Sequence, residues 1–419
     1  MQQEIIASVD FGSKKLSASI AVKNQDEEIE ILGVKSCKSL GIEKGLVKDI
    51  EKCRKNVNDL LKDLEDKTGK EIKGVSIGIS SRKIRTTEIT VTLSLEEGKV
   101  RSQDILKALK KGRKSITISS DESIIDILIN FYILDGNVIH KDILNWKGKN
   151  LELNLTLVIA KIKEVEKYYE LFEGTKYKIE FFKLNIFTGK QIFLNEKNSM
   201  EDIALVDIGA GNIDIAVFKN GIPQYVGNIP LGGNNISNDL AICGDFSFSE
   251  AENIKKIYST NYKSIYNDKA IEDNIKVGTR EISKKLFYEV TNARIEEILN
   301  HINMELKNTG HYDGICSIIL YGDGLSYFEG ISEIVNNIFK IKTKIITKTD
   351  LGIKNSENIT SLAIVKEVYD RLSLLGYNSK VKINENIENE KISELEHLDN
   401  NEEKKHLFKK LMGFFDKIF

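Results

Sequence analysis

The stretch ALVDIGAGNIDIAVFKNG, residues 204–221, decides the fold of this chain. It opens with an apolar run that ends at Asp207, passes through the small-residue turn 209–211, and resumes with an apolar residue at every second position. Two such runs around a tight turn are typical of a β-hairpin. The sequence therefore predicts a strand–turn–strand unit with a carboxylate near the end of its first strand.

The same unit opens the chain, as EIIASVDFGSKKLSASIAV at residues 4–22. Asp10 stands 197 positions before Asp207, and Gly12 stands equally far before Gly209. The alternating apolar positions keep the same register, with Leu16, Ala18 and Ile20 matching Ile213, Ile215 and Val217. A distant internal echo of this kind predicts two similarly built halves.

A third glycine turn, ILYGDGLSYFEG at residues 319–330, follows another apolar run. Gly322 and Gly324 lie between a predicted buried strand and a predicted helix. That position suits a nucleoside and its first phosphate, because the backbone N–H groups at the start of a helix attract anions.

Two facing turns of the first kind would suit a polyphosphate. Glycine has no side chain between backbone and ligand, so the N–H groups of such turns can close on phosphate oxygens. Asp10 and Asp207 would then bring two carboxylates near the phosphates, where they suit a magnesium ion that keeps most of its waters. Ser13, Lys14 and Asn212 are expected to add direct donors. Each turn alone is common, whereas the order hairpin, hairpin, strand–Gly-x-Gly–helix is much more specific.

The composition limits the other functional classes. The 419 residues suffice for roughly two to four domains, and 41% hydrophobic with 30% charged residues is globular. A net charge of -2 gives no basic field, so nucleic acid is not an expected partner. The four cysteines and five histidines are scattered and form no metal-ligand spacing. No secretion leader is expected, and the longest apolar stretch, 123–134, falls short of the ~20 residues of a spanning helix.

Three motifs in this order resemble the actin-like ATPase superfamily. VDFGSKK (9–15) resembles its first phosphate motif, VDIGAGNIDIAVF (206–218) its second, and ILYGDGLSYFEGI (319–331) its adenosine motif. Within the superfamily, roughly residues 1–375 are most similar to bacterial cell-division protein FtsA. The segments DIAVFKNG, IPLGGNNISNDLA, SEAENIKKIYS and NARIEEIL follow that family's order and spacing.

The resemblance implies an α/β, actin-like, two-lobed fold with duplicated ribonuclease-H-like domains. An inserted α+β subdomain in the first lobe and a C-terminal amphipathic helix complete it. The implied subdomains are IA at 1–83 and 163–198, IC at 84–162, IIA at 199–243 and 312–381, and IIB at 244–311.

The resemblance also implies a function. FtsA-like proteins polymerise on the inner face of the cytoplasmic membrane, bind ATP with magnesium, tether the C-terminal tail of FtsZ, and recruit later division proteins. A location at the division septum is therefore expected. The implied nucleotide-binding residues are Asp10, Gly12, Ser13, Lys14, Asp207, Gly209, Ala210, Gly211, Asn212, Gly232, Gly233, Glu252, Lys255, Gly322, Asp323 and Gly324, with Asp10 and Asp207 near the magnesium. Arg280, Lys284 and Arg294 are basic candidates for the FtsZ tail.

The sequence departs from the family's motifs at three positions. The second phosphate motif usually reads Gly-Gly-Gly-Thr, but here Ala210 and Asn212 replace its second glycine and its threonine. Asp323 stands where a glycine is usual. An alanine restricts the backbone where glycine-only angles are wanted. No general base can be nominated, so ATP binding is expected with slow or absent hydrolysis, and no catalytic residue is assigned.

The chain closes with an acidic segment and a basic, aromatic one. Residues 383–403 carry eight acids against one lysine, which is typical of a disordered linker, here assigned to 382–403. At helical spacing, KKHLFKKLMGFFDKIF (404–419) separates an apolar stripe from lysines, which suits the surface of an anionic membrane. The predicted membrane-binding residues are Leu407, Phe408, Lys409, Lys410, Leu411, Met412, Phe414, Phe415, Ile418 and Phe419.

Alternatives remain at this point. The terminal segment also suits a partner groove or the protein's own core. An actin-fold kinase for a small metabolite would need a carboxylate base near the γ-phosphate and no membrane tail. A type IV pilus assembly protein would share the fold and a similar insertion, but it usually lacks this tail.

Overall fold

The computed structural model describes residues 5–23, 28–194, 201–259, 273–277, 280–346 and 358–375. The predicted linker and terminal helix, residues 382–419, lie outside the described residues. The described chain forms two compact units. The larger comprises Met1–Glu88, Ile118–Asn130 and Thr156–Tyr369, and the smaller comprises Ile89–Thr117, Phe131–Leu155 and the end of the last described helix.

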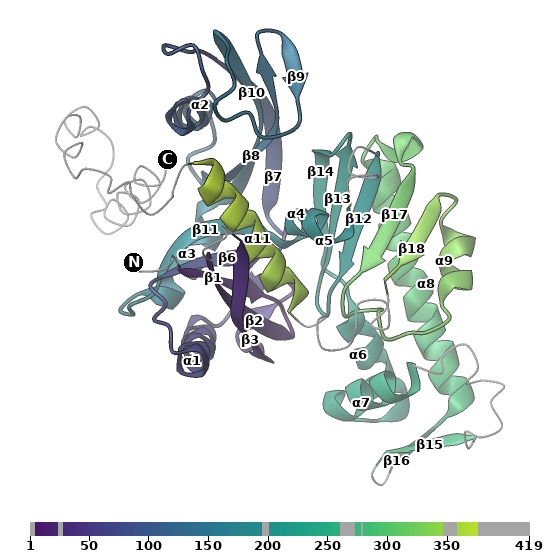
Figure 1. Ribbon diagram of the computed structural model, residues 1–419. Helices are drawn as coiled ribbons and strands as arrows, with labels where there is room; N and C mark the ends of the chain where they lie inside the picture. Colours follow the sequence, from purple (N-terminus) through teal and green to yellow (C-terminus); the bar gives the residue numbers. More distant parts are fainter. Residues whose placement is uncertain are drawn as a thin grey trace. The chain divides into compact units, whose positions relative to one another are not determined.

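The first sheet of the larger unit has the strand order β11-β6-β1-β2-β3 (Figure 1). Its strands are β1 (Ile5–Phe11), β2 (Lys15–Lys23), β3 (Ile29–Lys38), β6 (Gly74–Ile79) and β11 (Lys178–Leu184). β1 and β2 pair antiparallel from Ile5 opposite Val22 to Phe11 opposite Leu16. β6 runs parallel to both β1 and β11. The predicted opening hairpin is confirmed, and β3 extends it by a third strand.

The second sheet repeats this order as β14-β13-β12-β17-β18. Its strands are β12 (Ile203–Ile208), β13 (Ile213–Lys219), β14 (Ile222–Ile229), β17 (Ser317–Tyr321) and β18 (Lys342–Ile345). Three antiparallel strands are again followed by two parallel ones. Asp10 and Asp207 are each the last residue but one of the matching strands β1 and β12. The duplication that the internal echo predicts is confirmed.

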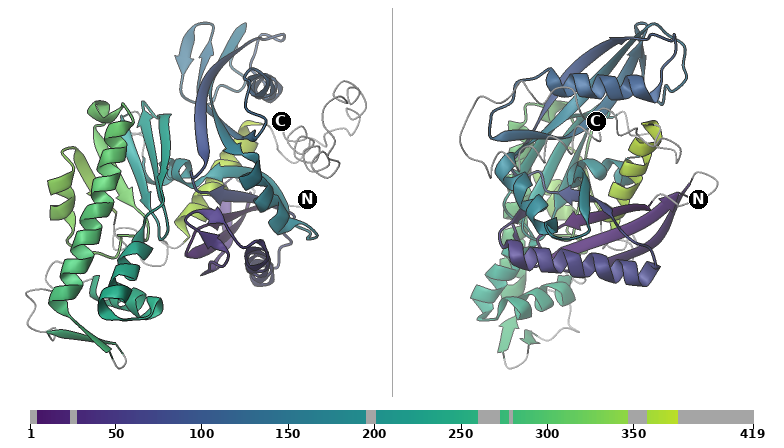
Figure 2. Two further views of the ribbon diagram at one scale, coloured as in Figure 1. Left: turned by 180° about the vertical axis from the view of Figure 1, so that it is seen from behind. Right: turned by 90° about the vertical axis from the view of Figure 1, so that its left-hand side faces the viewer.

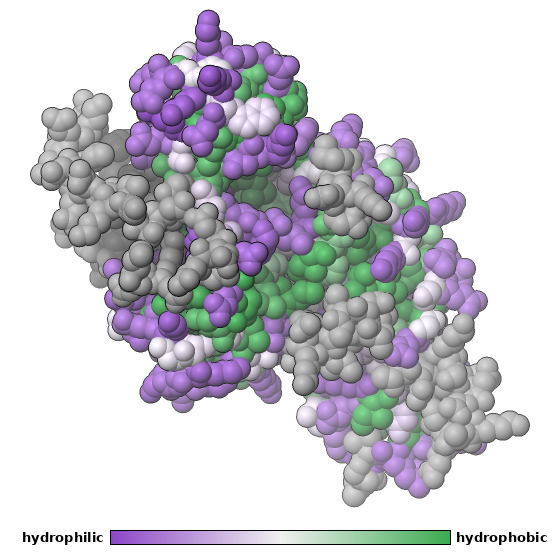
Figure 3. Space-filling view, in the orientation of Figure 1, coloured by the Kyte–Doolittle hydropathy of each residue, from purple (hydrophilic) through white to green (hydrophobic). Residues whose placement is uncertain are grey.

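Helices cover both faces of the first sheet (Figure 2). On one face lie α1 (Ile50–Thr68) and α3 (Ile162–Phe172), where the ring of Tyr168 packs edge-on against Phe11 at 5.3 Å. On the other face lies α11 (Ile359–Leu374), where Ser361 bonds to Ser8 and Ser19. The apolar residues of α1 face the sheet, and its outer surface is hydrophilic (Figure 3).

The helices of the second half are α6 (Gly233–Gly244), α7 (Phe248–Ser259), α8 (Lys284–Asn308) and α9 (Ser332–Ile338). They share one core with the second sheet, which includes Phe287, Ile295 and Phe328. The smaller elements of this unit are β4 (Ile42–Glu43), β5 (Leu46–Val47), α4 (Asn185–Thr188), α5 (Lys190–Phe193), β15 (Asn274–Val277), β16 (Arg280–Ser283) and the 3-10 turn Tyr312–Gly314.

A four-stranded sheet of order β7-β10-β8-β9 carries the smaller unit. Its elements are β7 (Ile84–Ser94), α2 (Ser102–Lys114), β8 (Glu122–Leu134), β9 (Asn137–Ile139) and β10 (Asn150–Lys161). Leu151, Leu153 and Leu155 of β10 are fully buried, as are Ile105, Ala108 and Leu109 of α2. The inserted α+β subdomain is therefore present, while its finer boundaries stay a prediction.

Two helices begin later in the chain than the sequence predicts. The run EISKKLFYEVTNARIEEILNHINMELK (281–307) predicts a helix over its whole length. The helix begins only at Lys284, because Arg280–Ser283 pairs with β15 and the Ser283 side chain caps Leu286 N–H. The helix expected just after the third glycine turn begins only at Ser332, because turns occupy 323–327 and 329–331. Among the described residues, no helix is both long and apolar enough to span a membrane.

Candidate functional site

The first and second glycine turns are built alike. Gly12 N–H donates to Lys15 O at 3.1 Å, and Gly209 N–H donates to Asn212 O at 2.9 Å. Each bond closes its hairpin directly after a buried strand whose last residue but one is an aspartate. The two hairpins therefore present equivalent backbone loops beside Asp10 and Asp207.

The third turn is pressed onto the second. Gly324 N–H donates to Ile208 O at 2.7 Å, and a side chain on Gly324 would bring its Cβ within 2.6 Å of Gly209 O. Gly322 has a φ of +99°, and a Cβ there would lie 2.2 Å from Asp207 Oδ1. Only glycine allows both the backbone angle and this close approach. The predicted Gly-x-Gly pair thus brings the segment after β17 against Asp207.

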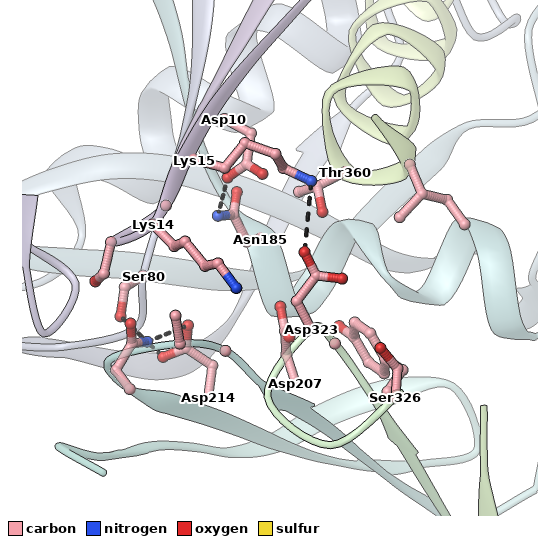
Figure 4. Close-up of a pocket in the computed structure, with 18 of the residues that line it drawn as sticks. Asp10, Lys14, Lys15, Ser80, Asn185, Asp207, Asp214, Asp323, Ser326 and Thr360 are labelled. Carbon is pink, nitrogen blue, oxygen red and sulfur yellow. Dashed lines mark hydrogen bonds and ion pairs between the residues drawn. The ribbon is translucent and has the colours of Figure 1, made fainter. Parts of the chain in front are cut away.

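The first turn joins them from the other sheet. A Cβ on Gly211 would lie 3.1 Å from Ser13, and Lys15 Nζ lies 3.8 Å from Asp323 Oδ2. Segments near residues 10, 207 and 322 therefore converge on one pocket, which Figure 4 shows in close-up. The predicted site residues that line it are Asp10, Gly12, Ser13, Lys14, Asp207, Gly209, Ala210, Asn212, Gly322 and Asp323.

The pocket gathers carboxyl groups that are costly to ionise. Burial raises the pKa of Asp10 to about 6, although Lys15 and a hydrogen bond from Asn185 oppose the shift. Burial raises the pKa of Asp207 well above its ordinary value, and the neighbouring carboxyl groups of Asp214 and Asp10 raise it further. Two desolvated acids side by side favour a cation or a proton between them. No group of three or more His, Cys, Asp or Glu side chains suited to a metal occurs among the residues that the structure describes.

Several pocket residues were not predicted from the sequence. Asn185 Nδ2 donates to Asp10 Oδ1 at 2.7 Å, and the Asn185 Oδ1 atom has no partner among the described residues. The buried hydroxyls of Tyr321 and Ser326 also lack one in that part of the chain. Buried polar atoms normally find partners, so these three suit a polar or hydrated ligand. The other pocket residues not predicted are Phe11, Lys15, Ser80, Phe193, Asp214, Ile346, Ile359 and Thr360.

Six predicted nucleotide residues do not line the pocket: Gly211, Gly232, Gly233, Glu252, Lys255 and Gly324. The glycines support its wall, since Gly233 N–H donates to Gly209 O at 3.0 Å. The Glu252 carboxylate contacts the ammonium of Lys14 from the first turn. Although burial disfavours its charge, Lys255 and Lys14 hold the pKa of Glu252 at about 2.

Lys255 is an interior ammonium group. It is 2% exposed and bonds to Gly233 O and Ser237 Oγ, each at 2.8 Å, and to the carboxylate of Glu252 at 2.7 Å. Burial lowers its pKa to about 8 despite that carboxylate. The Glu252–Lys255 pair joins α7 to the start of α6 and to Lys14, so a direct role in binding nucleotide stays a prediction.

The basic candidates for a partner tail all have acidic neighbours. Arg280 lies 3.1 Å from Asp245, and Lys284 lies 3.2 Å from Asp273. Arg294 contacts both oxygens of Asp239 on α6, at 2.5 and 3.1 Å, and so fastens α8 to α6. Their role in partner binding stays a prediction. The predicted membrane-binding residues, 407–419, lie outside the described residues.

Two matched sheets whose turns meet at one pocket define an actin-like protein. The model of the SHS2 domain inserted in FtsA matches residues 81–159, and the model of cell division protein FtsA matches residues 204–363. The chain belongs to the FtsA family of cell division proteins. The family resemblance that the sequence motifs indicate is therefore confirmed.

Relatives match over most of their length. The chain is 26% identical to cell division protein FtsA of Neisseria meningitidis, over 84% of this chain and 86% of the relative. It is 24% identical to FtsA of Bacillus subtilis, over 87% and 83%, and 23% identical to FtsA of Escherichia coli, over 93% and 94%. These matches favour a division role over the kinase and pilus alternatives.

Solved structures support the fold. The PilM-PilN type IV pilus biogenesis complex matches at a TM-score of 0.58 and 12% identity, covering 87% of this chain and 98% of the other. Ethanolamine utilization protein EutJ from Carboxydothermus hydrogenoformans matches at 0.50 and 15%, covering 87% and 91%. At such identity the likeness shows the fold alone.

Proposed function

We propose that this chain binds ATP with magnesium in the three-turn pocket, polymerises on the inner face of the cytoplasmic membrane, and anchors the FtsZ ring there at the division septum. Nucleotide acts as a conformational switch, and hydrolysis is slow or absent. Later division proteins are recruited to the assembled polymer. The single observation that carries the proposal is the meeting of three glycine turns from two duplicated sheets around buried carboxyl groups.

The pocket has the features that a magnesium–nucleotide complex requires. The turns of Gly12 and Gly209 offer backbone N–H groups from opposite sheets, and the turn of Gly322 adds a third wall. Asp10 and Asp207 face the cavity with raised pKa values, so a divalent cation removes the cost of their negative charge. When bound, magnesium neutralises phosphate oxygens and orders water around them.

The chain's own residues would position this complex. The Asn185 amide orients the Asp10 carboxylate and leaves its own carbonyl oxygen for a water or a ligand hydroxyl. The ammonium of Lys15 lies 3.8 Å from the Asp323 carboxylate in the third turn and offsets its negative charge. Lys14 is able to exchange its contact with Glu252 for a phosphate, because its side chain is 30% exposed.

The membrane role is argued from the sequence of residues 404–419. Each lysine near an anionic surface contributes about 1 kcal/mol, and the apolar stripe enters the acyl boundary. A single such helix gives reversible attachment, whereas a polymer that aligns many of them multiplies the hold without new contacts. Nucleotide that favours the polymer therefore also favours the membrane.

Titration of the full chain with Mg-ATP tests the pocket. Asp207→Ala removes one of the two buried pocket carboxyl groups proposed to lie near the magnesium, so we expect ATP affinity to fall at least about 100-fold, corresponding to roughly 3 kcal/mol. Asp207→Asn keeps the shape and should also lose the magnesium dependence. Asp63→Ala, an exposed carboxylate paired with Lys35, is the matched control and should bind normally. Unchanged affinity in folded Asp207→Ala would place the nucleotide elsewhere.

A further inference from the structure

A buried carboxylate at one edge of the pocket joins the two sheets. Asp214 is 4% exposed and stands on β13 in the second sheet. Its Oδ1 atom accepts from Ser80 Oγ at 2.9 Å, from Ser81 N–H at 3.0 Å and from Ser81 Oγ at 2.5 Å. Ser80 and Ser81 directly follow β6 of the first sheet. Figure 4 shows Asp214 and Ser80 side by side.

Two amides of the second half complete this cluster. Asn228 Nδ2 on β14 donates to Asp214 Oδ1 at 2.7 Å. Asn212 Nδ2 donates to both Asp214 Oδ2 and Ser80 Oγ, each at 3.1 Å. Ser81 Oγ also lies 2.7 Å from Gly227 O, so a second contact crosses between the sheets. Asp214 thus accepts hydrogen bonds from both halves of the fold.

Asn212 ties the cluster to the second phosphate turn. It is the residue that closes that turn, through Asn212 O and Gly209 N–H, and its side chain reaches across to Ser80. A threonine, usual here in the family motif, has one hydroxyl and cannot donate to both groups at once. The amide therefore adds a link between turn and cluster that a threonine cannot provide.

The first phosphate turn reaches the same place. Gly45 N–H donates to Ser13 Oγ at 2.9 Å, and a Cβ on Gly45 would lie 2.8 Å from Ser80 Cβ. Arg82 Nη1 donates to Lys44 O at 2.8 Å. Movement of either phosphate turn is therefore transmitted by direct contact to Ser80 and its neighbours.

We propose that Asp214, with Ser80, Ser81, Asn212 and Asn228, is an interlobe clasp that holds the two halves together, and that Asn212 makes the clasp respond to ligand on the phosphate turns. Asp214 is a positioning residue, because it acts through its hydrogen-bond donors and not on the ligand. The proposal rests on the proposed function only for the identity of the ligand. The hydrogen bonds of the clasp form in the protein without ligand.

Amide hydrogen exchange of the full chain without nucleotide tests the clasp. In Asp214→Asn an NH2 group replaces one of the two carboxylate oxygens. That group faces either Ser81 and Asn228 or Asn212, and because all three are donors, their hydrogen bonds to it are lost. Loss of such a buried bond should speed exchange in segment 79–82 by about tenfold or more. Ser81→Ala removes one hydroxyl and should give a smaller increase. Ser247→Ala, a hydroxyl deletion on the cap of α7, should leave segment 79–82 unchanged.

Adding Mg-ATP tests the link through Asn212. We expect the nucleotide to slow exchange in segment 79–82 of the wild-type chain, and this slowing to shrink in Asn212→Thr although ATP still binds within about tenfold. The affinity losses of Asn212→Thr and Asp214→Asn should be non-additive in the double variant, because the residues share a bond.

The outcomes separate the two proposals. Wild-type exchange in segment 79–82 of both Asp214→Asn and Ser81→Ala would overturn the clasp, whatever the ATP titration gives. Equal slowing by Mg-ATP in Asn212→Thr and wild type would overturn the link through Asn212. A wild-type chain that binds no Mg-ATP would defeat the proposed function, and the exchange data without nucleotide would still decide whether the clasp exists.

Discussion

At the scale of single residues, burial in the pocket changes the pKa of Asp10. Its ordinary pKa of 3.8 rises to about 6 on folding, because burial outweighs the attraction of Lys15 and the bond from Asn185. Between these two values the native protein keeps a proton that the unfolded chain has released. The contribution of Asp10 to stability without ligand therefore falls as pH rises from about 4 to about 6, and it stays lower above that.

Asp10→Asn should remove part of this loss. At pH 7, without nucleotide or magnesium, we expect the variant to be more stable than the wild type by on the order of 2 kcal/mol. The new amide oxygen can still accept from Asn185. At pH 4 the difference should nearly vanish. Urea unfolding at both pH values measures it.

The control for this prediction is Asp63→Asn, because Asp63 is exposed. Its effect at pH 7 should stay within about 0.5 kcal/mol. An Asp10→Asn variant that was no more stable than wild type at pH 7, or whose advantage was as large at pH 4 as at pH 7, would contradict the raised pKa.

Site residues within the three glycine turns could be predicted from the sequence, because spacing alone places Asp10 and Asp207 at equivalent strand ends. Asn185 and Ser80 could not. Each follows a different strand, and only the sheet order β11-β6-β1 brings the ends of β11 and β6 near the end of β1. A polar residue just after a buried strand was the available signal. The role of Asp214 was hidden for another reason, since its partners come from both sheets.

At the scale of elements, α11 is held to the first sheet near its start and at its middle. Near its start, Ser361 bonds to Ser8 and Ser19, and Ile359 and Thr360 line the pocket. Two turns later Glu367 contacts Lys183 of β11 at 2.9 Å. Lys183 is 1% exposed and also contacts Asp126 of β8 at 2.8 Å. One buried ammonium thus fastens α11 and β8 to the sheet.

Lys183→Met should destabilise the protein strongly. It leaves Asp126 and Glu367 without their shared cation inside the fold, which costs about 3–5 kcal/mol. Lys35→Met is the matched control, because Lys35 and Asp63 form an exposed pair at 2.5 Å whose loss costs about 0–1 kcal/mol. Urea unfolding midpoints compare the two. Equal, small losses would mean that the buried cluster does not anchor α11.

Most elements followed from apolar periodicity, and the exceptions have local causes. α8 begins later than the continuous helical pattern predicts, because the residues before it pair with β15 as a strand and Ser283 caps the helix. The segment after Gly324 stays in turns because its backbone bonds to Ile208 O and its residues wrap around the pocket. Such tertiary contacts are not visible in a sequence window.

At the scale of the whole molecule, the internal echo was the strongest signal, because two similar stretches 197 positions apart predict two similarly built sheets. The inserted domain, which the family resemblance implies, is confirmed by its own sheet and by the match to the SHS2 domain model. Subdomain boundaries, polymer contacts and the membrane helix depend on other molecules or on residues outside the described chain. They stay predictions.

The most direct test of the account is co-sedimentation with anionic liposomes of the full chain, a chain ending at residue 403, and full-length Asp207→Ala, each with and without Mg-ATP. We expect the full chain to pellet, and to pellet more with Mg-ATP, because polymer aligns many terminal helices. The truncated chain should stay in the supernatant, and the pelleted fraction of Asp207→Ala should not change with Mg-ATP. Equal pelleting of the truncated chain, or a nucleotide effect that survives in Asp207→Ala, would contradict a pocket that controls membrane attachment.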